Sequence, residues 1–161
     1  MMRMSFFVML LVLFVSAPSF GQDTVKNNQN KYMPFLSALG LEPVINSKGN
    51  IRFTHKDLVY FVETQSPEYI FSIVHYEDVT SVTGGKGCFD EFNQVIYNTM
   101  TYYDSPVVRG VENCELLAFR WFFDLPAGQE LTPDQLFSAI QRIRNGVSNA
   151  ITEIKSAGLI D

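Results

Sequence analysis

The sequence predicts an α+β domain in which one antiparallel β-sheet of about five strands packs against helices. Two blocks of residues with a period of two are rich in β-branched and aromatic side chains. Segments with a helical period of three to four residues precede, separate and follow these blocks. The predicted order is helix, three strands, helix, two strands, helix, and this order lacks the regular βαβ alternation of parallel sheets.

The first 21 residues have the layout of a secretory signal peptide. Arg3 precedes an apolar run from Phe6 to Val15, and Ser19 and Gly21 occupy the −3 and −1 positions of a cleavage site before Gln22. A run of about ten apolar residues is too short to span a bilayer, which takes roughly 20. We therefore expect export to the periplasm or the extracellular space, without stable membrane insertion of the mature chain.

The mature chain is predicted to consist of a flexible leader over residues 22–30 and a single domain over residues 31–161. The leader is expected because its residues are almost all polar. Removal of the signal peptide leaves 11 basic and 17 acidic residues, a net charge of −6. The basic residues are scattered singly, so the chain lacks the basic patch that nucleic-acid binding requires.

The domain is predicted to begin with a short helix that Gly40 ends, with Pro34 in its first turn. The apolar residues of this helix fall at helical spacing: Tyr32, Phe35, Leu36 and Leu39. Three strands should follow as an antiparallel meander, over residues 51–55, 58–64 and 69–76. A short edge strand over residues 43–45 could precede them.

The second half of the domain should contain a helix, two strands and a long final helix. The first of these helices is expected over residues 88–103. Pro106, which follows shortly after, should prevent its continuation. The strands are expected over residues 107–111 and 115–125. The final helix begins with a capping box, Thr132-Pro133-Asp134-Gln135, and Gly158 is placed to cap its end.

This element order resembles the type III secretion chaperone-like fold, and in particular its YbjN-type branch. The resemblance spans residues 31–158 and rests on GNIRFTHKDLVYFVETQSPEYIFSIV (Gly49 to Val74), on FNQVIYN (Phe92 to Asn98) and on the closing hairpin and helix. It implies a small, often dimeric protein that binds other proteins. The signal peptide departs from the cytosolic chaperones, and no functional residue is carried over.

Two cysteines, Cys88 and Cys114, are the candidates for a disulfide. Exported proteins favour disulfides. A helix of about 24 Å followed by a returning strand of about 25 Å would bring Cys114 back to the level of Cys88. The alternative is two buried thiols that pack as small apolar side chains.

The sequence contains no recognisable catalytic motif or metal-binding motif. His55 and His75 fall near the ends of predicted strands, and neither belongs to a pair with zinc-ligand spacing. We therefore predict a non-enzymatic protein without cofactor or metal, and treat both histidines as structural. An enzyme would have only His55, His75, Asp57 and Glu63 to offer as catalytic groups.

The predicted strands are apolar on both faces, which suggests that part of the sheet is an interface. Residues Leu117 to Leu125 place one face in the core, but the other face carries Arg120 and Phe122. Three amphipathic helices supply one apolar stripe each and can cover one face, so we expect the other to bind a second copy, as a homodimer, or a client protein. The predicted interface residues are Arg120, Phe122, Tyr60 and Tyr76.

A small-molecule binder is the alternative function. It would use an aromatic pocket between the sheet and the helices, lined by residues such as Trp121 or Tyr103.

Overall fold

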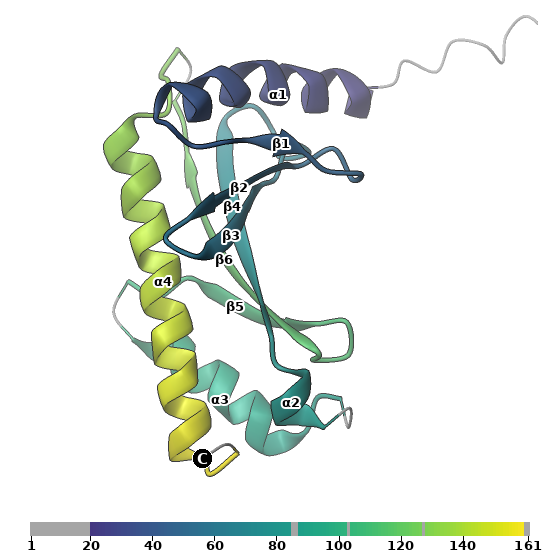
Figure 1. The fold of residues 1–161 in the computed structure, drawn as a ribbon, viewed down its shortest axis with the longest axis vertical. Coiled ribbons are helices and arrows are strands. Elements are labelled where there is room, and N and C mark those ends of the chain that lie inside the picture. The colour runs from purple at the N-terminus through teal and green to yellow at the C-terminus, as the bar shows by residue number, and fades with distance from the viewer. Residues whose placement is uncertain (1–19, 85–86, 103, 127, 160–161) are drawn as a thin grey trace, which may run out of the picture.

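The computed structural model describes residues 20–84, 87–102, 104–126 and 128–159, and most of the expected signal peptide lies outside these ranges. The described residues form a mixed α+β structure with one open antiparallel sheet of six strands and four helices (Figure 1). The predicted class is confirmed. The sheet has more strands than the main prediction, because the edge segment Val44–Ile45 does pair as a strand.

The chain begins with helix α1 (Phe20–Ala38), and strands β1 (Val44–Ile45), β2 (Ile51–His55), β3 (Leu58–Val62) and β4 (Ile70–Asp78) follow. A four-residue helix, α2 (Thr80–Thr83), was not predicted. It leads to α3 (Asp90–Thr101), β5 (Val107–Val111), β6 (Leu116–Asp124) and α4 (Pro133–Ser156). The spatial order of the strands is β1-β2-β3-β4-β6-β5, and each neighbouring pair is antiparallel.

The hydrophobic core lies between the sheet and the helices. Helix α4 runs along the sheet, α3 packs beside it, and α1 crosses the end that carries β1 and β2 (Figure 1). Alternate residues of each central strand point into this core. The buried residues that point into this core from the central strands include Ile51, Phe53, Tyr60, Val62, Phe71, Ile73, His75, Leu117 and Phe119.

Helix α4 begins and ends where local chemistry predicts. The side chain of Thr132 accepts a hydrogen bond from the backbone N–H of Gln135, whose side chain accepts one from the backbone N–H of Thr132. At the other end Gly158 has a φ of 67°, and Leu159 N–H donates to the carbonyl of Ile154. Both predicted caps are confirmed.

Helix α1 corrects two expectations. Residues 22–30 are helical, so the flexible leader is wrong, and Pro34 lies well inside the helix instead of in its first turn. The amide nitrogen of Asn28 donates to the carbonyl oxygens of Thr64, at 2.8 Å, and Ser66, at 2.9 Å. These tertiary bonds stabilise a polar segment that has few apolar residues of its own. Pro34 itself is exposed.

Candidate functional site

One face of the sheet is left uncovered by the helices of the described residues. We call the helix-covered face the inner face and the opposite one the outer face. The outer face carries Phe61, Glu63, Ser72, Val74, Tyr76, Ala118, Arg120 and Phe122. Strand register aligns Phe61, Val74 and Arg120 across three neighbouring strands. The predicted interface residues Arg120, Phe122 and Tyr76 therefore share one surface.

The middle of the outer face is shielded by the protein's own long side chains. Val74 is fully buried although none of the four described helices covers this face, and its strand neighbours are Phe61 and Arg120. The expectation that another molecule must cover the whole face was therefore too broad. The exposed apolar part of the face is smaller. It includes Phe122, which is 53% exposed, and Tyr76, which is 38% exposed.

An ion pair lies at the centre of the outer face. Arg120 donates from Nη2 to Glu63 Oε1 at 2.7 Å, and Ser72 Oγ donates to Glu63 Oε2 at 2.5 Å. Arg120 Nε is buried and forms no hydrogen bond within the described residues. Both oxygens of the Glu63 carboxylate therefore accept a hydrogen bond, one of them from the guanidinium of Arg120.

Two aromatic side chains flank this ion pair. Tyr76 packs edge-on against Phe61, with ring centroids 5.7 Å apart. Partial burial raises the pKa of the Tyr76 hydroxyl, and the negative charge of Glu63 raises it further against the opposing charge of Arg120. Tyr76 therefore presents a neutral phenol beside charged groups. Aromatic side chains next to an arginine are enriched at protein interfaces.

A groove runs over the outer face beside these residues. It has a volume of about 520 Å³, and Val59, Phe61 and Tyr76 are among its lining residues. The β1–β2 turn, with Lys48, and the β5–β6 turn, with Glu112, line it as well. In Figure 1 both turns lie to the right of the sheet, with the β1–β2 turn above the β5–β6 turn.

A second depression of about 400 Å³ continues the groove toward the ion pair, because Lys48 and Asn50 line both. Its other lining residues are polar: Glu63, Gln65, Ser66 and Arg120. The outer face therefore has an apolar part and a polar part within one continuous surface.

Tyr60, the fourth predicted interface residue, is on the wrong face. It is 0% exposed and stacks on Phe53 in the core, with ring centroids 5.5 Å apart. Burial raises its pKa to about 12, although the nearby Arg144 charge opposes this rise. The prediction of Tyr60 was wrong because β3 is apolar on both faces, so its alternation does not say which face is covered.

The two histidines occupy different environments. His75 lies inside β4, not near a strand end as expected, and is buried. Its Nδ1 lies 2.8 Å from the carbonyl oxygen of Val59, and its Nε2 lies 2.9 Å from Glu77 Oε2. His55 ends β2 and contacts the ring of Phe137. Within the described part of the chain, no three His, Cys, Asp or Glu side chains gather closely enough to hold a metal ion.

Trp121, one of the two residues suggested for an aromatic pocket, does not line the groove. Trp121 is half-buried on the inner face, and the guanidinium of Arg142 lies 4.5 Å from its ring centroid. Arg142 also forms an ion pair with Asp104. Tyr103 lies outside the described residues.

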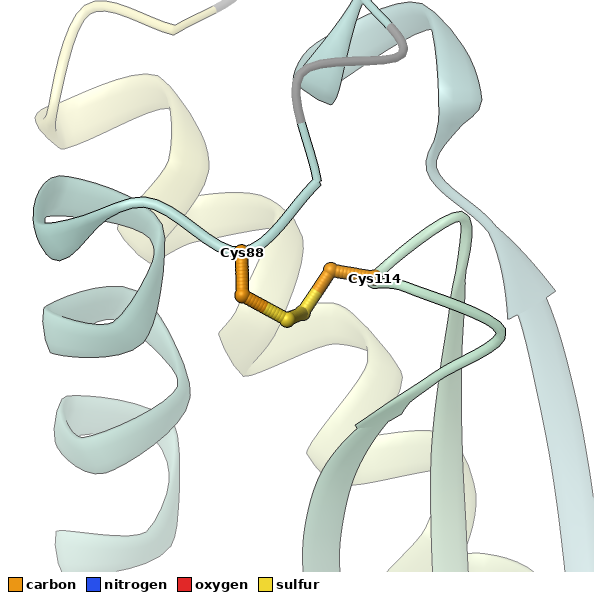
Figure 2. Close-up of a disulfide and its surroundings, with 2 residues drawn as sticks. All are labelled: Cys88 and Cys114. Atoms are coloured by element: carbon orange, nitrogen blue, oxygen red, sulfur yellow. A yellow bond between two sulfur atoms is a disulfide. The ribbon is translucent and has the colours of Figure 1, made fainter.

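The disulfide alternative for the cysteines is confirmed. Cys88 and Cys114 are bonded, with Cα atoms 5.2 Å apart (Figure 2). The bond ties the segment before α3 to the β5–β6 turn and so fixes one flank of the groove. With a sequence separation of 26 residues, restriction of the unfolded chain is worth about 3 kcal/mol.

Sequence reasoning missed the groove itself. Its two sides come from turns about 60 positions apart, with strand residues such as Phe61 and Tyr76 between them, and nothing in either turn indicates the other. Glu63 was noted only as a catalytic candidate, yet it binds Arg120. The opposite charges of Glu63 and Arg120 were visible in the sequence, but their pairing depends on strand order.

No helix among the residues placed in the structure is both long and apolar enough to cross a membrane.

No protein-family model and no curated protein matches this chain. A crystal structure of an uncharacterized protein from Methanothermobacter thermautotrophicus is similar, with a TM-score of 0.57 and 13% sequence identity. The match covers 80% of this chain and 97% of that one. At this identity the similarity shows a shared fold and nothing about activity.

Proposed function

We propose that this protein is an exported, non-enzymatic protein-binding module that uses the outer face of its sheet. The observation that carries this proposal is the exposure of Phe122 and Tyr76 around the Arg120–Glu63 ion pair, on the face that the described helices leave uncovered. Exposed apolar patches of this kind commonly mark protein-binding sites. The partner is a second copy of the chain or a client protein in the same compartment.

Two sequence features support the rest of the proposal. The N-terminal 21 residues support export, and the element order supports kinship with the YbjN-type, chaperone-like proteins. The non-enzymatic part is supported by the outer face itself, whose central carboxylate, Glu63, already accepts hydrogen bonds from Arg120 and Ser72. A carboxylate held in this way is suited to orienting a guanidinium.

Capture of partners from envelope extract tests this function. The mature wild-type protein serves as bait beside Phe122→Ser, which should retain its fold because the side chain is more than half exposed. Tyr97→Ser is the matched control, since Tyr97 is a comparably exposed aromatic residue on α3, away from the outer face. We expect Phe122→Ser alone to lose the partner. Equal capture by both variants would refute the use of this face.

Light scattering of the same three proteins separates the two kinds of partner. A second copy would appear as a dimer that Phe122→Ser dissociates and Tyr97→Ser does not. A client protein would leave the purified bait monomeric and appear only in the extract.

The groove also supports a second candidate, the binding of a small molecule. Its volume of about 520 Å³ falls in the usual range of small-molecule sites. Thermal stabilisation by members of a metabolite library would support this function, and Phe61→Ala should abolish the stabilisation.

A further inference from the structure

The β5–β6 turn, which lines one side of the groove, has an unusual backbone. Glu112, Asn113 and Cys114 have φ values of 50°, 56° and 62°. Residues other than glycine avoid this left-handed region because the Cβ atom crowds the backbone, and it is occupied mostly by single residues. Three in succession need an external restraint.

The disulfide is positioned to supply that restraint. It joins the last residue of the left-handed turn, Cys114, to Cys88 just before α3 (Figure 2). Gly110 faces the bond, and a Cβ atom there would collide with Cys114 Sγ. The side chain of Asn113 packs in the same way over Gly87, where a Cβ atom would lie 2.7 Å from its Oδ1. Two glycines thus make room for the closed turn.

The same turn forms part of the groove. Val111, Glu112 and Leu116 line it opposite Lys48 and Asn50. The position of Glu112 therefore depends on the conformation that the disulfide holds, and the groove's shape on that side depends on the redox state of Cys88 and Cys114.

We propose that the Cys88–Cys114 disulfide is a redox-sensitive clasp that holds the β5–β6 wall of the groove, and that its reduction loosens this wall and weakens partner binding. The binding half of this inference rests on the proposed function. The structural half concerns the turn alone.

The chemistry requires a dithiol reductant. Cys88 is exposed whereas Cys114 is 1% exposed, so a thiolate of the reductant attacks Cys88 Sγ and the sulfur of Cys114 leaves as a thiolate and takes up a proton. The second thiol of the reductant then attacks the mixed disulfide and releases Cys88 as a thiol. The protein gains two electrons and two protons, and the reductant becomes a disulfide.

Hydrogen exchange of the mature chain tests the structural half, with dithiothreitol as the reductant. We expect backbone amides of residues 110–116 to exchange at least about tenfold faster after reduction, while those of residues 136–154 in α4 change by less than about twofold. Cys88→Ala/Cys114→Ala should reproduce the reduced state and show no response to dithiothreitol. Unchanged exchange at residues 110–116 would overturn the clasp.

A matched pair of variants tests the role of the left-handed backbone. Cys88→Ala/Cys114→Ala and Cys88→Ala/Cys114→Gly both lack the bond, but only glycine accepts a positive φ at position 114 without crowding. The glycine variant should keep the amide chemical shifts of residues 111–116 closer to those of the oxidised wild type. Equal displacement of these shifts in both variants would overturn the link between the bond and the turn conformation.

Partner capture tests the binding half. We expect Cys88→Ala/Cys114→Ala to lose capture by about tenfold or more if the wall contributes to binding. A loosened wall with undiminished capture would overturn the coupling while leaving the proposed function intact. If the oxidised wild type captures nothing that depends on Phe122, the proposed function fails, and the exchange experiment still decides whether the clasp exists.

Discussion

Arg120 donates a hydrogen bond to Glu63 at 2.7 Å, and so joins strand β6 to the end of β3 across the intervening β4. Ser72 of β4 donates to the other oxygen of the same carboxylate. The three side chains form a polar bridge over a row of strands whose remaining outer-face side chains are mostly apolar. This bridge is the central feature of the proposed binding surface.

The Arg120–Glu63 pair should contribute little to folding stability. Their side chains are 36% and 21% exposed, so solvent screens the attraction. In a double-mutant cycle with Arg120→Ala and Glu63→Ala, we expect a coupling free energy of about 1 kcal/mol or less, measured by urea denaturation. The same variants should weaken partner capture strongly. A coupling well above about 2 kcal/mol would instead identify the pair as a structural element of the fold.

Asn28→Ala should destabilise the protein although this residue lies in a segment that looks like a leader. Its amide donates to the carbonyl oxygens of Thr64 and Ser66, and the residue is buried. Loss of these bonds leaves the two carbonyls short of a donor, so the free energy of unfolding should fall by about 1–3 kcal/mol. The neighbouring exposed Asn27, which bonds Glu68, is the control. Asn27→Ala should cost less than about 1 kcal/mol, and equal effects would contradict the prediction.

Gly146→Ala should be destabilising even though alanine favours helices. A Cβ atom at this position would lie 2.7 Å from Pro106 Cδ and 3.3 Å from Phe119 Cδ1, and the proline ring is rigid. The clash should outweigh the gain of about 1 kcal/mol in helix propensity and lower stability by about 1–3 kcal/mol. Ser138→Ala, on the exposed side of the same helix, provides the control. Thermal denaturation should place its midpoint at or slightly above that of the wild type, and a Gly146→Ala protein as stable as this control would refute the clash.

Alkaline pH should unfold the protein through two buried tyrosines. Burial raises the pKa of Tyr32 from 10.0 to about 12, with a smaller contribution from the charge of Glu68, and burial raises that of Tyr60 to about 12 as well. A raised tyrosine pKa means that the folded state disfavours the phenolate. The stabilisation is therefore fully present below the unfolded pKa of about 10 and is lost as pH rises through about 12.

Tyr32→Phe isolates one of these titrations. The Tyr32 hydroxyl is buried and has no hydrogen-bond partner among the residues that the structure describes, so its removal should change stability at pH 7 by less than about 1 kcal/mol. Between pH 10 and 12 the free energy of unfolding should fall less steeply with pH in this variant. The reason is that about one proton fewer is released when the variant unfolds. Urea midpoints measured across this range check the slope. Parallel curves for the variant and the wild type would exclude Tyr32 from the transition.

Local patterns predicted most of the elements correctly. The capping box at Thr132 and the glycine at position 158 set the limits of α4 through bonds within a few residues. The alternation in β6 placed Leu117 and Phe119 in the core, where both are buried. The pairing of Cys88 with Cys114 remained open between a disulfide and two thiols, because spacing indicates reach and cannot establish the approach of two Cα atoms.

The errors arose where distant segments decide the outcome. Residues 22–30 are polar and look disordered, yet the carbonyl oxygens of Thr64 and Ser66 bind Asn28 and stabilise α1. Tyr60 and Phe61 both sit on an apolar strand, and only the position of the helices puts Tyr60 in the core and Phe61 in the groove.

The sequence by itself thus determined the fold class, the caps of the last helix and the inner face of β6, because each depends on interactions between residues close together in the chain. The tertiary structure alone decided which face of β3 is buried, how the outer face is shielded, and where the groove lies. These features depend on strand order and on contacts between segments tens of residues apart. Such contacts produce no periodic pattern in the sequence of either segment.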